Sequence, residues 1–401
     1  MTPPRAQGRA YFIGPTPDPV TVTAEPADKL AVALDRLLGL QPEGLERACE
    51  ASVFSDRVQT KLWTTTRRHV RLMRDHASLR ADSLMEVYQA ILEGSTWPQG
   101  RAREAQASTD FTLLLGNSLG RRLLAAYTEA DFGERSIFLP GRANSLRDQR
   151  VEALDAAPDV PPVDPEVSDY TEMTTLAQRE ISHAMLQKGV IVTISRRLII
   201  NDDVAAVQRI ADELGRAARR TLARTIWAPW IANATYGADG VAWFHATHSN
   251  LQTSAISETE VIAAVLKLLN QTQPGNNEKM GTRVRPGSLW LTVPNALWDA
   301  AYKLNQTQAS ALFHLFGEDN EFIIVNPLLT DANDWGIHRD AREVESLRVN
   351  FLNGREEPEF MVADLPGADQ MFVGDRARFK LRHEYGVALA EYRGAIKAVV
   401  P

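Results

Sequence analysis

The sequence predicts an α+β protein with a long helix, an extended arm and two further groups of strands. The stretch "GVIVTISRRLII" is rich in β-branched residues, which is typical of a strand, and it runs into a helical pattern over 202–228. Residues 257–345 alternate helical and strand-like segments, beginning with a capping box at Ser257 and Glu260. The stretch "RFKLRHEYGVALAEYRG" alternates apolar and polar side chains, as in a half-exposed antiparallel strand.

Composition narrows the class of protein. The chain has 401 residues, of which 44% are hydrophobic, and this predicts a sizeable core and two or three domains. The net charge of −7 argues against a basic nucleic-acid binder, although a local basic face stays open. Cys49 is the only cysteine, which excludes a disulfide within the chain and a cysteine metal cluster. No signal core or membrane-spanning apolar run is present, so we expect a soluble, non-secreted protein.

The first 105 residues predict a mostly helical N-terminal extension. From Arg57 to Arg74 it carries six basic residues and no acid. This run is interpreted either as a solvated helix face or as a surface for an acidic partner. Residues 94–110 are polar and predict a linker.

An acidic segment over 151–178 predicts a projecting arm. It holds seven acids and four prolines and no Lys or Arg, so it can bury little apolar surface. Strand-like stretches flank it, notably "GVIVTISRRLII". We therefore predict a two-stranded arm with an acidic tip.

The residue pattern of the long helix over 202–228 predicts that one face packs on the protein and that the other faces stay free. Asn201 is placed to cap its start. Apolar residues recur at steps of three and four and form a narrow stripe, which suits packing on a single surface. The stripe consists of Val204, Val207, Ala211, Leu214, Ala218, Leu222 and Ile226. Five arginines cover the remaining faces, namely Arg209, Arg216, Arg219, Arg220 and Arg224.

The stretch "GNSLG" matches the G-x-S-x-G pattern, in which Ser118 would be a hydrolase nucleophile on a strand-to-helix turn. The preceding residues do not predict the strands that such a site needs, and no Gly-rich oxyanion loop lies upstream. The alternative is a simple turn into a helix. A serine hydrolase stays as the alternative function.

The stretch "FHATHSN" places His245 and His248 three residues apart. They could share a metal ion, but no third ligand is marked, and the alternative is a polar turn with hydrogen-bonded imidazoles. No nucleotide-binding motif is present. We therefore expect no cofactor and no catalytic carboxylate pair.

The order of these parts resembles the major capsid proteins of tailed phages, in particular the Mu-like major head subunits. The resemblance rests on "FTLLLGNSLGRRLLAAY", "RRLIINDDVAAVQRIADELGRAARRT", "GVAWFHATHSN" and "KLRHEYGVALAEYRG". It implies the Hong Kong 97 type capsid fold, with an N-terminal arm, an extended β-hairpin called the E-loop, a peripheral domain with a long spine helix, and an axial domain.

The resemblance implies a division of the chain into six parts. They are an N-terminal helical extension at 1–105, an N-arm at 106–145, the E-loop at 146–195, a peripheral domain with the spine helix at 196–256, an axial domain at 257–345, and closing strands of the peripheral domain at 346–401. Some relatives cross-link through an E-loop lysine, but this chain has no Lys between Lys61 and Lys188.

Five- and six-subunit rings need contacts in which one patch meets a different patch. We expect acids of the arm to lie near basic residues of an adjacent subunit, with the five spine arginines as first candidates. The arm acids are Asp155, Asp159, Asp164, Glu166 and Asp169. The alternative is that both surfaces face water.

The implied function is that of a major capsid protein that self-assembles into pentamers and hexamers of an icosahedral shell around double-stranded DNA. The implied partners are further copies of the chain and packaged DNA, contacted without sequence specificity on the inner face. Portal, scaffold and decoration proteins are further candidates, and no membrane is expected. The implied location is the virion capsid, assembled in the bacterial host cytoplasm. An adaptor protein with a basic helical N-terminus is a third hypothesis.

Overall fold

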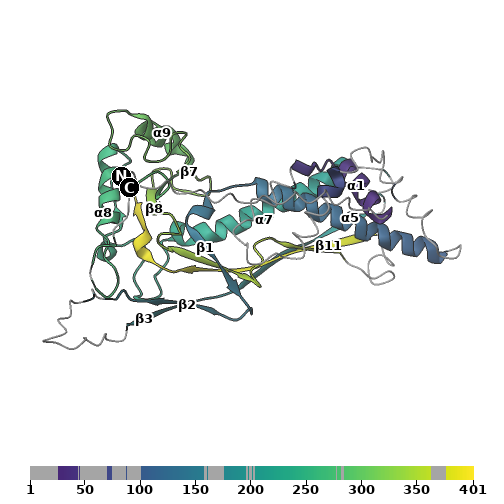
Figure 1. Cartoon of the computed structure of the whole chain (residues 1–401), viewed down its shortest axis with the longest axis horizontal. Helices are drawn as coiled ribbons and strands as arrows, with labels where there is room; N and C mark the ends of the chain where they lie inside the picture. Colours follow the sequence, from purple (N-terminus) through teal and green to yellow (C-terminus); the bar gives the residue numbers. More distant parts are fainter. Residues whose placement is uncertain are drawn as a thin grey trace, which may run out of the picture.

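A computed structural model gives the arrangement of the chain (Figure 1). The structure describes residues 26–43, 45, 70–74, 87, 101–157, 160, 176–195, 197, 201, 204–276, 278–280, 284–362 and 376–401. The acidic tip, Cys49 and most of the basic N-terminal run therefore lie outside the described residues. The α+β class is confirmed, because long helices and separate sheets are both present.

The elongated part of the molecule is a sheet covered by helices. Its strands are β1 (Phe138–Ala143), β4 (Leu186–Ser195), β9 (Leu347–Leu352), β10 (Glu359–Val362) and β11 (Arg376–Leu389). β11 pairs with β4 on one side and with β9 and β10 on the other, and β1 pairs with β9 in parallel. Helices α5 (Arg101–Glu129) and α7 (Val204–Ala232) lie along this sheet, with α1 (Pro26–Leu37) at its far end (Figure 1).

The second sheet forms a separate unit at the other end of the molecule (Figure 1). Its strand order is β5-β12-β8-β6-β7. The strands are β5 (Leu251–Gln252), β6 (Leu289–Val293), β7 (Ile323–Val325), β8 (Trp335–Arg339) and β12 (Ala395–Ala398). Helices α8 (Glu258–Leu269) and α9 (Trp298–Gln306) belong to this unit. Ser257 caps α8 by accepting a hydrogen bond from Glu260 N, as the capping box predicts.

The spine helix α7 packs as its pattern predicts. Val207, Ala211, Ala218, Leu222 and Ile226 are buried. The helix runs four residues beyond the predicted end at 228, although Pro229 removes one backbone donor. Buried Trp227 and Trp230 flank the proline and anchor this last turn in the core.

The arm differs from its prediction in one strand. Its described strands are β2 (Gln149–Leu154) and β3 (Gln178–His183), which pair with each other. The predicted arm strand "GVIVTIS" belongs instead to β4, which pairs with β11 over ten residues. Strand propensity identified the strand, but its partner lies almost 200 residues away and leaves no local signal.

Two predicted boundaries also differ from the structure. The linker predicted at 94–110 and the boundary at 105 both overlap α5, which is continuous from Arg101. Residues 101–110 are polar but rich in Ala, Arg, Glu and Gln, which favour helices. At the other end, β12 does not close the first sheet but pairs with β8 and β5 in the second.

Candidate assembly surfaces

The exposed face of α7 keeps four of its five arginines. Arg209, Arg216, Arg220 and Arg224 are exposed, and Arg216 donates to Glu213 one turn away at 2.9 Å. No described residue forms an ion pair with the other three. They could meet an anionic partner.

Arg219 is the exception and corrects the prediction. It is 5% exposed, and its Nη2 lies 2.6 Å from Oε1 of the fully buried Glu134. Its guanidinium also lies over the Tyr127 ring at 5.4 Å. Helical spacing alone placed Arg219 with the free arginines, because Glu134 is distant in sequence. Arg219 is therefore a core residue of its own chain.

The electrostatics of this pair follow from burial. Burial raises the pKa of the Glu134 carboxyl, and the nearby Arg219 opposes that shift. The pKa of Arg219 is raised, because attraction to Glu134 and Tyr127 outweighs the effect of burial. The two side chains therefore depend on each other to stay charged in the core.

The base of the arm is held inside its own chain. Arg179 on β3 donates to Asp155 at 3.0 Å, to Glu391 at 3.0 Å and to the Tyr236 hydroxyl at 2.8 Å. Asp155 therefore has a partner within the chain, whereas Asp159, Asp164, Glu166 and Asp169 lie outside the described residues.

The arm also rests on the second unit. Ala156 N donates to Pro274 O at 2.8 Å, and Asn276 Nδ2 donates to Ala157 O at 3.0 Å. Arg150 and Glu180 bridge the two arm strands at 2.8 Å. These contacts fix the direction in which the arm leaves the body.

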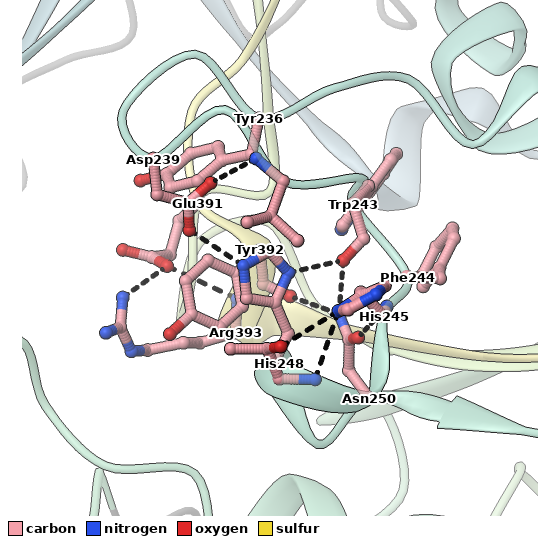
Figure 2. Close-up of polar contacts among 12 residues, drawn as sticks. Tyr236, Asp239, Trp243, Phe244, His245, His248, Asn250, Glu391, Tyr392 and Arg393 are labelled. Atoms are coloured by element: carbon pink, nitrogen blue, oxygen red, sulfur yellow. Dashed lines mark hydrogen bonds and ion pairs between the residues drawn. The ribbon is translucent and has the colours of Figure 1, made fainter.

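Two chain crossings between the units pack against each other (Figure 2). One leads from α7 to β5 and contains η3 (Ala246–His248), and the other leads from β11 to β12 and contains η5 (Tyr392–Gly394). The His248 ring stacks on the Tyr392 ring with centroids 3.8 Å apart. Asn250 donates to Trp243 O at 2.8 Å and Tyr392 O at 3.4 Å. The junction is a polar and aromatic seam that sets the angle between the units.

The two histidines of "FHATHSN" lie in a polar turn and are hydrogen-bonded, which is the second of the two interpretations given to them from sequence. His248 contacts Trp243 O through Nδ1 at 2.9 Å and Asp239 through Nε2 at 2.8 Å. His245 Nδ1 accepts from Thr247 N at 3.2 Å. Over the described ranges no group of three or more His, Cys, Asp or Glu side chains could hold a metal ion.

Ser118 lies in the middle of α5, neither on a nucleophile elbow nor at a helix entry. It is fully buried and donates to Asp35 of α1, which Arg121 also contacts at 2.8 Å. Gly116 leaves room for Val362. The "GNSLG" pattern is therefore a packing motif, read from sequence as a turn because its two glycines usually interrupt helices.

None of the helices in the described ranges is both long enough and apolar enough to cross a membrane.

Comparison with known proteins decides the family. A family profile described as phage capsid protein matches residues 179–398, from β3 to β12. The chain belongs to the phage capsid protein family. This match covers more than half of the chain and confirms the resemblance to tailed-phage capsid proteins. It includes α7, the whole second sheet and the strands β4, β9, β10 and β11 of the first sheet, but not β1.

Solved capsid structures are similar at low identity. A virus-like particle from Pyrococcus furiosus is 13% identical with a TM-score of 0.41, covering 70% of this chain and 97% of its own. The capsid of a native GTA particle is 12% identical with a TM-score of 0.43, and the match covers 67% of this chain and 91% of the GTA chain. The procapsid of bacteriophage JBD30 is 14% identical with a TM-score of 0.36, and the match covers 75% of this chain and 76% of the JBD30 chain. No match was found among curated protein sequences.

Family membership makes this chain a structural capsid protein rather than an enzyme, and its first partner is itself. The serine hydrolase alternative has no support, since Ser118 is buried inside a helix. The functional surfaces of the chain are accordingly the ones that copies of it can present to each other.

Proposed function

We propose that copies of this chain form the pentamers and hexamers of an icosahedral shell that encloses double-stranded DNA. The observation that carries the proposal is the family match over 179–398. Contacts with DNA would be non-specific, and portal, scaffold and decoration proteins are further proposed partners. Assembly would take place in the cytoplasm of the bacterial host.

The parts of the subunit would then take distinct roles. The first sheet with α7 would be the peripheral domain, and the second sheet with α8 and α9 the axial domain near the ring centre. The β2–β3 hairpin would be the base of the E-loop. The contacts of Arg179 with Glu391 and Tyr236 support this assignment, because they anchor the arm at the junction of the two units.

The contact between subunits would be heterologous, with the acidic arm of one copy on a basic surface of the next. Since Arg219 is buried, the spine helix offers only Arg209, Arg216, Arg220 and Arg224. Exposed ion pairs contribute about 0–1 kcal/mol each and are screened by salt, so they would set register more than affinity.

Sedimentation velocity of the expressed full chain tests the proposal. We expect a fast-sedimenting species whose particles, viewed by negative-stain electron microscopy, are closed and uniform. Particles from phage-producing cells should hold nuclease-resistant double-stranded DNA. A chain that stays monomeric or dimeric at every concentration, even with its natural structural partners co-expressed, would contradict the proposal.

A further inference from the structure

The polar contacts at the junction of the two units meet at His248 (Figure 2). This residue is 4% exposed. Its backbone oxygen accepts from Gln271 Nε2 at 2.9 Å, and Gln271 follows helix α8 of the second unit. Its ring faces Trp243 and Asp239, which lie in the crossing that leaves α7 of the first unit. His248 therefore joins groups from both units.

The two oxygens that face the His248 ring are held in place by other contacts. Trp243 packs in the core of the first unit, where its ring centroid lies 5.6 Å from that of Trp230 on α7. Asp239 is held in its loop by Val241, whose backbone N–H donates to Oδ1 at 2.9 Å. Neither oxygen can turn away from the ring without the loss of these contacts.

Both ring nitrogens of His248 face oxygens that only accept hydrogen bonds. Nδ1 lies 2.9 Å from the carbonyl oxygen of Trp243, and Nε2 lies 2.8 Å from Asp239 Oδ2. Burial opposes the ionisation of Asp239. Hydrogen bonds from Val241 N and from His248 outweigh burial and hold the pKa of that carboxyl below its ordinary value, so it is a charged carboxylate. A neutral imidazole has a single N–H, so only the doubly protonated ring satisfies both contacts.

The surroundings of the ring suit that positive charge. The Asp239 carboxylate balances it at 2.8 Å. The Tyr392 ring stacks on it with centroids 3.8 Å apart and an interplanar angle of 12°, and the face of an aromatic ring attracts a cation. Arg393 also lies over the Tyr392 ring, at 4.3 Å, and its own charge is balanced by Glu391 at 2.8 Å.

Two further titratable rings face His248 and leave this charge assignment unchanged. The Tyr236 and His245 rings have centroids 6.3 and 6.4 Å from it. Burial raises the pKa of Tyr236 to about 12, so its hydroxyl stays neutral. His245 is exposed, and its Nδ1 accepts from the backbone N–H of Thr247. The pair of His248 and Asp239 therefore carries the proton dependence of the junction.

We infer that His248 is a proton-controlled latch between the two units, closed while its ring carries both protons and open when it has lost one. A ring with one proton donates to only one of its two acceptors, and the lone pair of the other nitrogen then faces an oxygen. The contact is complete at lower pH and is lost as the pH rises, which is the sign for a histidine that gains an acidic partner on folding. The inference concerns a single copy and stands without the proposed shell.

The angle between the units in the full-length chain tests the latch. Spin labels at Arg220→Cys on α7 and Thr259→Cys on α8, in a Cys49→Ser background, report that angle as a distance distribution. Dilution with unlabelled chain restricts the measurement to distances within one copy. We expect a narrow distribution at about pH 6 and one about twofold broader at about pH 9. Distributions that coincide at the two pH values would overturn the inference.

The variant Asp239→Asn separates the proton from the shape of the junction. The amide keeps Oδ1 for Val241 N and offers an Nδ2 donor to the unprotonated Nε2 of a neutral His248. We expect this variant to fold and to give the narrow distribution at both pH values. The control His245→Asn removes a nearby histidine, keeps an acceptor for Thr247 N, and should respond to pH as the unsubstituted chain does. An unchanged pH response in Asp239→Asn would overturn the inference.

Nitrogen NMR of chain labelled at histidine gives a second readout that does not depend on the size of any movement. At about pH 7 we expect protons on both ring nitrogens of His248 in the unsubstituted chain and on Nδ1 alone in Asp239→Asn. His248→Gln identifies the signals. A single ring proton on His248 in the unsubstituted chain would overturn the inference.

Discussion

Arg219 and Glu134 form a buried ion pair that ties the spine helix to the turn after α5. Arg219 Nη2 lies 2.6 Å from Glu134 Oε1. The backbone N–H of Phe132 donates to the other carboxylate oxygen, Glu134 Oε2, at 3.1 Å. Removal of one partner would leave the other charge buried and alone. Such a loss costs about 3–5 kcal/mol.

We therefore expect Arg219→Met to lower the free energy of unfolding by about 3–5 kcal/mol. The adjacent exposed residue supplies the control, since Arg220→Met should change stability by about 0.5 kcal/mol or less. Chemical denaturation of unassembled chains measures both. The double variant Arg219→Met/Glu134→Gln should recover part of the loss. Equal stability of Arg219→Met and Arg220→Met would refute a buried pair.

Two buried histidines predict loss of stability in acid. Burial lowers the pKa of His338 and of His383 to about 3, from an ordinary value near 6.5. The unfolded chain binds these protons first, so stability is full above about pH 6.5 and falls as the pH drops toward 3. Each histidine should account for about 2 kcal/mol between pH 7 and pH 5.

His338 offers the cleaner test of this acid dependence. Its Nε2 lies 2.9 Å from Ser136 Oγ and its Nδ1 lies 3.3 Å from Thr292 Oγ1. We expect His338→Gln to be less stable at pH 7 but to lose less stability between pH 7 and pH 5. Denaturation at both pH values measures the difference. An unchanged pH slope would show that His338 does not carry the effect.

The N-terminal helix α1 should detach when its buried carboxylate is removed. Asp35 is fully buried, accepts from Ser118 and pairs with Arg121. Leu34 and Leu38 pack in a buried cluster with residues from the middle of α5 and the first turns of α7. Asp35→Ala leaves those donors unsatisfied, at about 1–3 kcal/mol. Hydrogen exchange over residues 30–38 should quicken while exchange in β6 and β8 stays constant. The exposed Glu43→Ala variant is the control, and equal exchange in both would contradict docking through Asp35.

Close packing at Gly116 gives a reciprocal test of the "GNSLG" motif. A Cβ at this position would overlap Val362 Cγ2. Gly116→Val should therefore destabilise the chain by about 1–3 kcal/mol through overpacking. Val362→Ala should relieve part of that loss in the double variant. Additive losses measured by thermal unfolding would exclude contact between the two positions.

Sequence patterns correctly predicted the elements that depend on residues close together in the chain. The capping box at Ser257, the buried stripe of α7 and the alternation along β11 were all visible in sequence, because each depends on residues close together in the chain. The pairing of β4 with β11, the return of β12 to the second sheet and the burial of Arg219 were not. Each of these depends on a partner far away in sequence.

The candidate contact surfaces show the same division. The acidic arm was evident from composition, and so was the arginine content of α7. Helical spacing placed Arg219 among the exposed arginines, yet the structure buries it against Glu134, which is distant in sequence.

Cryo-electron microscopy of particles assembled from the full chain tests the central claim most directly. The account predicts closed icosahedral shells in which this chain forms fivefold and sixfold rings. Particles without such rings would contradict the claim that this chain builds the shell.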